Sequence, residues 1–321
     1  MNHIGAAIWL PLFLAEALLD LNLVHIVCSL SADDTISATA ELYRTVRSFP
    51  SIFRESFCPH SEHPCQKCTP GNTCPFRSVF CQELSSDPQI VRRHQKPPLP
   101  FAFTISNSCI LTSTLELHAV LIGNAVNHAD LLCSSLNNML QSGYNPEPVR
   151  SFQVADISCC DHSGIRRTLT FGEIPAGDIA LLSCREILDG TSSSECITIH
   201  FESPLRLLLR GSIARSFDFS LFFRSQLRRG SSLYAYYGDG ELEIDYRLLS
   251  DAAEKVSVLE SNVCYSLPRW SSRRDMAGLL GSASFCGLAD GMSQLLTLGS
   301  CFNAGKGSSF GFGSYRIESG N

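Results

Sequence analysis

The sequence predicts an α+β protein built from two split βαβ units in tandem. Both halves of the chain show the same order of patterns, which is a strand, a helix, further strands, a second helix and a last strand. The 321 residues are about twice the length of a typical domain, and 44% hydrophobic with 17% charged residues excludes a largely disordered chain. We therefore expect an N-terminal domain over residues 1–150 and a C-terminal domain over 151–321.

The first half contains the elements of one such unit. The branched apolar run 21–30 is typical of a strand, and 39–57 has apolar residues at helical spacing, with a break expected near Pro50. Strands are expected over 101–105 and 115–122, and a helix over 127–141. The cysteine-rich stretch 58–81 has no hydrophobic periodicity, so it is predicted to be a loop inserted into this domain.

The second half repeats these elements. Residues 196–205 (CITIHFESPL) alternate between apolar and polar side chains, which predicts a half-buried strand. A helix is expected over 217–237, closed by Gly238, and a mixed element over 251–265. The patterns over 279–288, 292–299 and 310–317 then predict a strand, a helix and a final strand.

The net charge of −6 leaves no basic field over the whole chain, so any site for a polyanion has to be local. The apolar opening, residues 1–23, has no Lys or Arg and contains Pro11, Glu16 and Asp20. It fits a buried segment better than a signal peptide or a membrane span. We expect a cytoplasmic, reduced protein with no membrane partner, in which most of the 15 cysteines are small core residues.

Four cysteines in the inserted loop have the spacing of metal ligands: Cys58, Cys65, Cys68 and Cys74. A loop without a hydrophobic core can be held by four thiolates around one tetrahedral ion, which predicts structural zinc. An iron–sulfur cluster uses the same ligands, and His60 or His63 can replace a cysteine. The alternative is an exposed loop with unligated thiols.

The C-terminal run 305–313 (GKGSSFGFG) is rich in glycine. Gly305, Gly307, Gly311 and Gly313 allow successive backbone N–H groups to line one concavity that binds phosphate, and Lys306 adds a positive charge. The spacing matches neither the P-loop nor the dinucleotide-binding fingerprint. A glycine-rich hairpin that packs on a helix is an equally good interpretation.

A set of nine arginines with aromatic residues between them lies in the second half, including Arg206 and, after Trp270, Arg273 and Arg274. Arginine beside an aromatic ring can hold a single-stranded backbone and stack on its bases. Arg224 and Arg228 are four apart on a helix, where a solvated face is the simpler interpretation. The common catalytic motifs GxSxG and HExxH are absent, and the nine histidines are scattered along the sequence.

These segments occur in the order found in one known family. The chain resembles the CRISPR-associated endoribonucleases that process precursor CRISPR RNA, which belong to the RAMP superfamily, over most of residues 39–317. The C-terminal half of the resemblance is carried by Phe201–Leu207 (FESPLRL), the helix that ends in Tyr237-Gly238, Trp270–Arg274, 278–287 and 305–313. In the N-terminal half, the cysteine loop with Cys74-Pro75-Phe76 and the stretch Pro98–Phe103 look like the cysteine-loop branch of that family.

The resemblance implies two tandem ferredoxin-like (RRM-like) domains and binding of CRISPR repeat RNA. It also implies metal-independent cleavage, in which a 2′-hydroxyl attacks the adjacent phosphate and leaves a 2′,3′-cyclic phosphate. Lys306 and its neighbouring glycines are the RNA-contacting positions that carry over, with Arg273 and Arg274 as additions.

The sequence departs from the family at the catalytic histidine. Members of the cysteine-loop branch have a Gly-His pattern in the first helix, several residues before the first cysteine. Counting back from Cys58, this chain has Pro50-Ser51 at that place. A shifted site among His60, His63 and Tyr43 is the remaining hypothesis for the general base. The alternative function is a catalytically inactive member that holds CRISPR RNA among other effector subunits, and a third is a structural metal-loop protein unrelated to RNA.

Overall fold

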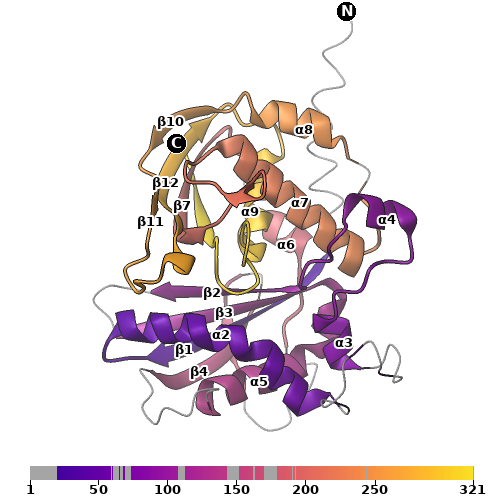
Figure 1. Ribbon diagram of the computed structural model, residues 1–321, viewed down its shortest axis with the longest axis vertical. Coiled ribbons are helices and arrows are strands. Elements are labelled where there is room, and N and C mark those ends of the chain that lie inside the picture. Colours follow the sequence, from indigo (N-terminus) through magenta and orange to yellow (C-terminus); the bar gives the residue numbers. More distant parts are fainter. Residues whose placement is uncertain are drawn as a thin grey trace, which may run out of the picture. The chain divides into compact units, whose positions relative to one another are not determined.

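In the computed structural model, the chain divides into two compact units (Figure 1). We call residues 22–182 the N-terminal unit and residues 183–320, together with residues 20–21, the C-terminal unit. The structure describes residues 20–58, 60, 65, 68, 74–107, 113–142, 152–161, 163–169, 179–189, 191, 193–242 and 244–320. The predicted burial of the opening segment concerns residues 1–23, of which 1–19 lie outside this part, while Leu21 and Leu23 are buried.

The N-terminal unit has the order strand, helix, two strands, helix, strand that the sequence predicts. Its elements are β1 (Asn22–Ser31), α2 (Thr35–Phe57), α3 (Pro75–Phe80), α4 (Pro88–Arg93), β2 (Phe101–Asn107), β3 (Thr114–Ile122), the 3₁₀ helix η3 (Gly123–His128), α5 (Ala129–Ser142), β4 (Gln153–Cys160) and β5 (Arg166–Thr168). The strands form an antiparallel sheet in the order β2-β3-β1-β4-β5, and β6 (Leu182–Ser183) pairs with β1.

The two faces of this sheet differ in chemistry because successive residues of a strand point to opposite sides. Val24, Ile26 and Cys28 of β1 are almost fully buried on the face that α2 and α5 cover, where Phe49 of α2 makes an edge-to-face contact with Phe103 of β2. The other face, which we call the N-terminal polar face, carries polar side chains on all five strands: His25, Ser106, Glu116, His118, Ser158 and Arg166.

Helix α2 begins where Asp34 accepts a hydrogen bond from the backbone N–H of Ile36. The predicted break at Pro50 is wrong, because the helix continues through it to Phe57. Proline removes one backbone donor from the helix, but Phe49 and Phe53 on either side of it are fully buried against the sheet. Burial of these rings keeps the helix continuous. A shorter helix, α3, also forms within the predicted cysteine loop, starting at Pro75.

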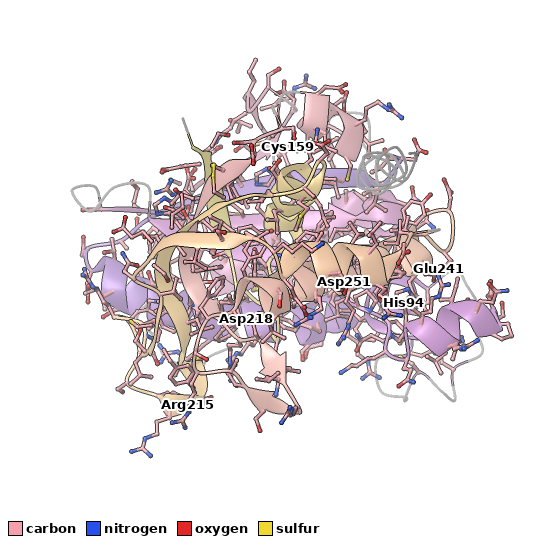
Figure 2. All side chains as sticks on the ribbon, turned by 90° about the horizontal axis from the view of Figure 1, so that it is seen from above. His94, Cys159, Arg215, Asp218, Glu241 and Asp251 are labelled. Atoms are coloured by element: carbon pink, nitrogen blue, oxygen red, sulfur yellow. A yellow bond between two sulfur atoms is a disulfide. The ribbon has the colours of Figure 1, made fainter. Side chains whose placement is uncertain are left out.

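The C-terminal unit repeats the fold. Its elements are α6 (Cys184–Asp189), β7 (Cys196–Leu205), the hairpin β8 (Leu208–Leu209) and β9 (Ser212–Ile213), α7 (Phe219–Tyr237), α8 (Tyr246–Ala253), β10 (Ser257–Ser261), β11 (Cys264–Ser266), the 3₁₀ helix η5 (Arg274–Met276), β12 (Gly278–Cys286), α9 (Met292–Phe302) and β13 (Tyr315–Ser319). Helix α7 starts at Asp218, which accepts a hydrogen bond of 2.7 Å from the N–H of Leu221 (Figure 2).

The antiparallel order β10-β12-β7-β13 is the same as β2-β3-β1-β4 in the N-terminal unit. Two tandem ferredoxin-like domains are therefore confirmed. The boundary expected at residue 150 is wrong, because β4 follows it and pairs with β1, so the N-terminal unit continues to Leu182. The expected last strand also differs, since residues 311–313 form turns and β13 starts only at Tyr315.

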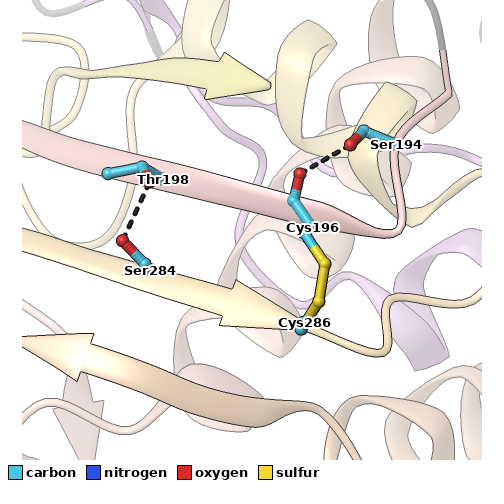
Figure 3. The surroundings of a disulfide bond; sticks show 5 residues. All are labelled: Ser194, Cys196, Thr198, Ser284 and Cys286. Carbon is cyan, nitrogen blue, oxygen red and sulfur yellow. Dashed lines mark hydrogen bonds between the residues drawn. A yellow bond between two sulfur atoms is a disulfide. The ribbon is translucent and has the colours of Figure 1, made fainter. Parts of the chain in front are cut away.

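Cys196 and Cys286 form a disulfide between the first residue of β7 and the last residue of β12 (Figure 3). The expectation of a fully reduced chain is wrong at this pair, because the two cysteines are register partners on neighbouring strands, with their Cα atoms 4.2 Å apart. Cys28, Cys133, Cys159 and Cys184 are buried thiols, as expected of core cysteines. No helix in the described ranges is both long and apolar enough to cross a bilayer.

Candidate functional site

The glycine-rich run, residues 305–313, forms a loop that is fastened along the end of β7. We call it the glycine loop. The backbone N–H of Lys306 donates to the carbonyl oxygen of Arg206 at 2.9 Å, and that of Gly313 donates to Pro204 at 3.2 Å. Just beyond the loop, the N–H of Ser314 donates to the Ser203 hydroxyl at 2.8 Å. These bonds fix the loop on the SPLR segment that carries the family resemblance.

Two of its glycines are required by close backbone contact. Gly305 has φ 71°, and a Cβ atom there would lie 2.6 Å from the carbonyl oxygen of Arg206. Gly313 has φ 67°, and its Cβ would fall on the carbonyl oxygen of Ala304. Any other residue is strained at both positions. The glycines therefore bring two stretches of backbone together, which is part of the packing interpretation of this run.

The loop nevertheless leaves polar groups without protein partners. The backbone N–H groups of Gly307, Ser308 and Ser309 donate no hydrogen bond to any described residue. Lys306 is exposed, and within the described ranges neither Lys306 nor Arg206 forms an ion pair. Three successive donors beside two uncompensated cations are chemically suited to bind an anion.

Arg206 connects the strand end to the loop through its side chain as well. Its guanidinium lies 5.0 Å from the centre of the Phe312 ring, and its Nε is buried without a partner in the described part of the chain. A cation held over an aromatic face keeps its charge and loses little rotamer freedom on binding. Arg206 is a site residue that the spacing of the glycines does not reveal, since only tertiary contact places it on the loop.

The other two arginines proposed as RNA contacts lie in and next to η5. Arg273 is exposed and forms a bidentate pair with Asp275, at 3.0 and 2.7 Å. The hydrogen bonds that Arg273 donates to the Asp275 carboxylate raise the pKa of Arg273, and the carboxylate offsets its charge locally. Arg274 is exposed and makes no ion pair with a described residue. Of these two side chains, Arg274 is therefore the one with an uncompensated charge.

Of the three catalytic candidates, the structure describes Tyr43 and His60. Tyr43 is 2% exposed on the face of α2 that packs on the sheet. His60 is exposed in the cysteine-rich stretch, and His63 lies outside the described residues. Helix α2 contains no histidine, in agreement with the departure from the family at Pro50-Ser51.

The four predicted metal ligands are all described. Cys58, Cys65 and Cys74 lie near enough to Cys68 to raise its pKa by charge repulsion, which adds to the larger effect of desolvation. As placed, no three described Cys, His, Asp or Glu side chains are arranged to hold one metal ion. A fifth cysteine, Cys81, hydrogen-bonds with Cys65, and burial is the main reason that the pKa of Cys81 rises to about 12.

A second polar group, missed by the sequence analysis, occupies the N-terminal polar face. His25 Nε2 lies 3.0 Å from His118 Nδ1, and His118 Nε2 lies 3.2 Å from Glu116 Oε2. Glu116 also accepts two hydrogen bonds from the Arg166 guanidinium, at 2.5 and 3.0 Å. Hydrogen bonds from His118 and Arg166 lower the pKa of Glu116 to about 2. The sequence signal for this group was the recurrence of polar residues along the strands. That pattern does not show which polar residues of different strands meet.

Comparison with known proteins agrees with this fold. The family model described as "CRISPR-associated endoribonuclease Cas6" matches residues 199–315, and AF_1859_N, described as an N-terminal domain, matches residues 43–174. No curated protein sequence matches the chain.

Similar solved structures cover nearly the whole chain. A Thermus thermophilus Cas6 is 13% identical with a TM-score of 0.54, over 93% of this chain and 99% of its own. A Cas6 substrate mimic complex is 16% identical with a TM-score of 0.51, over 92% of this chain and 99% of its own. A Cas6 product complex is 16% identical with a TM-score of 0.50, over 93% of this chain and 100% of its own. At these identities the likeness to the solved structures shows a shared fold, and the similarity to the Cas6 family model extends over residues 199–315.

Proposed function

We propose that this protein binds CRISPR repeat RNA through its glycine loop and cleaves precursor CRISPR RNA. The observation that carries the binding proposal is the pair of uncompensated cations, Arg206 and Lys306, beside the free N–H groups of residues 307–309. An RNA backbone supplies phosphate oxygens that accept from such donors without any reading of base sequence. The match of residues 199–315 to an endoribonuclease family model, and the likeness in fold to a Cas6 substrate mimic complex and a Cas6 product complex, support RNA as the anion.

The proposed reaction needs no metal. The 2′-hydroxyl of one nucleotide attacks the adjacent phosphorus while the bond to O5′ breaks, which gives a 2′,3′-cyclic phosphate and a 5′-hydroxyl. A base takes the 2′-hydroxyl proton, an acid protonates O5′, and a cation or N–H donor stabilises the charge on the phosphate. The glycine loop offers groups for the last task.

A binding protein without cleavage activity is the second candidate function. The observation in its favour is the lack of any histidine on α2 together with the burial of Tyr43. Such a protein would hold CRISPR RNA among other subunits of an effector complex. Incubation of the full chain with a repeat RNA in excess chelator separates the two functions. Cleavage with a cyclic-phosphate end supports the enzyme, and binding without cleavage supports the alternative.

The binding surface is tested with Lys306→Ala and Arg206→Ala. We expect each to weaken repeat-RNA binding and to reduce the slope of log K against log salt by roughly 0.7–0.9, the effect of one phosphate contact. Lys255→Ala is the matched control, since Lys255 is an exposed lysine in the same unit that lies outside the glycine loop. Unchanged affinity and slope in both loop variants would remove the glycine loop from the RNA interface.

For the cysteine loop we propose a structural zinc ion bound by Cys58, Cys65, Cys68 and Cys74. Support comes from the donor set, whose thiols lie within electrostatic range of one another. Because no three of them are placed to share an ion in this structure, the metal would have to draw the sulfur atoms together. An iron–sulfur cluster is the alternative with the same ligands.

Elemental analysis of the purified full chain tests the zinc site. We expect about one zinc per chain, and loss of that zinc in the double variant Cys65→Ser with Cys68→Ser. Iron with acid-labile sulfide identifies a cluster instead. A wild-type protein without any metal excludes both.

A further inference from the structure

The N-terminal polar face holds a chain of four hydrogen-bonded charged or titratable side chains, Arg166, Glu116, His118 and His25. They come from β5, β3 and β1, of which β3 and β1 are neighbours while β4 lies between β1 and β5. Ser106 of β2 adds a contact of 3.1 Å to His118 Nε2. Glu116 and His118 are 16% and 20% exposed, so the network is partly shielded from water while still reaching the surface.

The contacts of these side chains favour one arrangement of protons. Glu116 is ionised and can only accept, so we assign a hydrogen to His118 Nε2, and the Ser106 hydroxyl at 3.1 Å from the same atom then accepts as well. In neutral His118 the other nitrogen, Nδ1, is then an acceptor, and the 3.0 Å contact requires that His25 Nε2 donates to it. Neutral His25 therefore has its lone pair on Nδ1. That atom makes no hydrogen bond with any residue that the structure describes.

This arrangement follows the logic of a carboxylate–histidine relay, in which one group orients the next and stabilises its charge. When Nδ1 of His25 takes up a proton, the proton on Nε2 of His25 can pass to Nδ1 of His118. The positive charge then rests on the ring next to Glu116 instead of on His25, which is half-buried. Burial is the first reason that protonation of His25 by itself is unfavourable, and it lowers the pKa of His25 to about 3.

We propose that His25 is the general base of RNA cleavage in this protein, with His118 and Glu116 as positioning residues, at a site that replaces the missing first-helix histidine. The proposal rests on the proposed function, because it names the residue that performs the reaction given above. The substrate class is a single RNA phosphodiester with a free 2′-hydroxyl.

The step balances without a further reactant. The 2′-hydroxyl proton moves to His25 Nδ1 as the 2′-oxygen bonds to phosphorus, the bond from phosphorus to O5′ breaks, and O5′ takes a proton from water. The hydroxide formed from that water then receives the proton held by the histidine pair, which restores the neutral relay.

Single-turnover cleavage of a repeat RNA by the full chain in excess chelator tests the assignment. We expect His25→Ala to reduce the rate constant by about 10²- to 10⁴-fold, with RNA affinity within roughly threefold of wild type. His118→Ala and Glu116→Gln should cost about 10- to 100-fold and shift the pH dependence, because His118, Glu116, Arg166 and Cys160 are the titratable groups that face His25. Added imidazole should restore part of the activity of His25→Ala.

His200→Ala is the matched control, since His200 also pairs with a glutamate on the second sheet, at 3.0 Å from Glu318. We expect it to cleave at the wild-type rate. If His25→Ala does not fold by circular dichroism, His25→Gln keeps an amide donor near the Nε2 position and lacks the base. Wild-type rates in the His25 and His118 variants overturn this inference alone. A wild-type protein that binds RNA and never cleaves it overturns both this inference and the enzyme part of the proposed function.

Discussion

The two sheets of this protein share one topology and differ in the chemistry of their polar faces. In the N-terminal sheet, Glu116 and His118 are only 16% and 20% exposed and belong to a continuous network. In the C-terminal sheet, Arg316 pairs with both Glu202 and Glu318, and these side chains are 38–53% exposed. The helix-covered faces are equally apolar. The comparison teaches that the covered face sets the fold, while the polar face is free to carry function.

The largest expected effect concerns the covered faces. Phe49→Ala in α2 removes a fully buried ring that contacts Phe53, Phe101 and Phe103, and we expect the free energy of unfolding to fall by about 3–5 kcal/mol. Phe222→Ala should cost a similar amount in the C-terminal unit, where that ring contacts Phe201 and Tyr315. Urea denaturation measures both.

Phe57→Ala is the control for the first variant, because Phe57 lies at the end of the same helix and is only half-buried. A loss below 1 kcal/mol for either Phe49→Ala or Phe222→Ala would show that the two covered faces are not packed alike.

The next effect is specific to the C-terminal sheet. Reduction of the Cys196–Cys286 disulfide releases a crosslink across 90 residues of sequence, and we expect a loss of about 2–4 kcal/mol of stability. Thermal unfolding with and without dithiothreitol, on wild type and on Cys196→Ala with Cys286→Ala, measures it. The double variant should be insensitive to the reductant. A wild-type melting temperature that dithiothreitol leaves unchanged contradicts the prediction.

The third effect is specific to the N-terminal sheet and depends on pH. The pKa of Glu116 lies at about 2, against an ordinary value of 4.5, because His118 and Arg166 hydrogen-bond to the carboxylate. Since this pKa is depressed by folding, the stabilisation is complete above pH 4.5 and is lost as the pH falls toward 2. Glu116→Gln should cost on the order of 2 kcal/mol near pH 7 and almost nothing near pH 2. Urea denaturation at these two pH values measures it, and an equal loss at both would contradict the ion-pair explanation.

The smallest effect is expected on the exposed polar face of the C-terminal sheet. Arg316→Met removes contacts with Glu202 and Glu318, whose side chains are 38% and 53% exposed. Exposed pairs are screened by water, so we expect a change below about 1 kcal/mol in urea denaturation. A loss above 2 kcal/mol would mean that the two polar faces are energetically alike.

Much of the fold was predictable because local patterns and tertiary contacts agree. The alternation of residues 196–205 predicted β7 to the residue, and the expected helix over 217–237 is α7 apart from its first two residues. Predictions were wrong where a distant contact overrides local preference. Pro50 does not end α2 because the rings on either side are buried. Residues 311–313 are turns, and the backbone N–H of Gly313 donates a hydrogen bond to the distant carbonyl oxygen of Pro204.

The candidate sites were predictable in part. The glycine run pointed to the loop that Lys306 occupies, since glycine density is visible in the sequence itself. The chain from Arg166 to His25 was not predictable, because its members are separated by up to about 140 positions, and the contact of Arg206 with the loop likewise depends on tertiary structure.

The sequence by itself determined the strand and helix periods, the repeated order of elements and the family to which the chain is related. These depend on the residue types within short windows, which is where hydrophobic alternation and backbone preference act. Only the tertiary structure decided which polar side chains share a face, which cations lack a partner and where the first unit ends. Those properties depend on register between distant strands, and a shift of one residue would send every side chain of a strand to the other face.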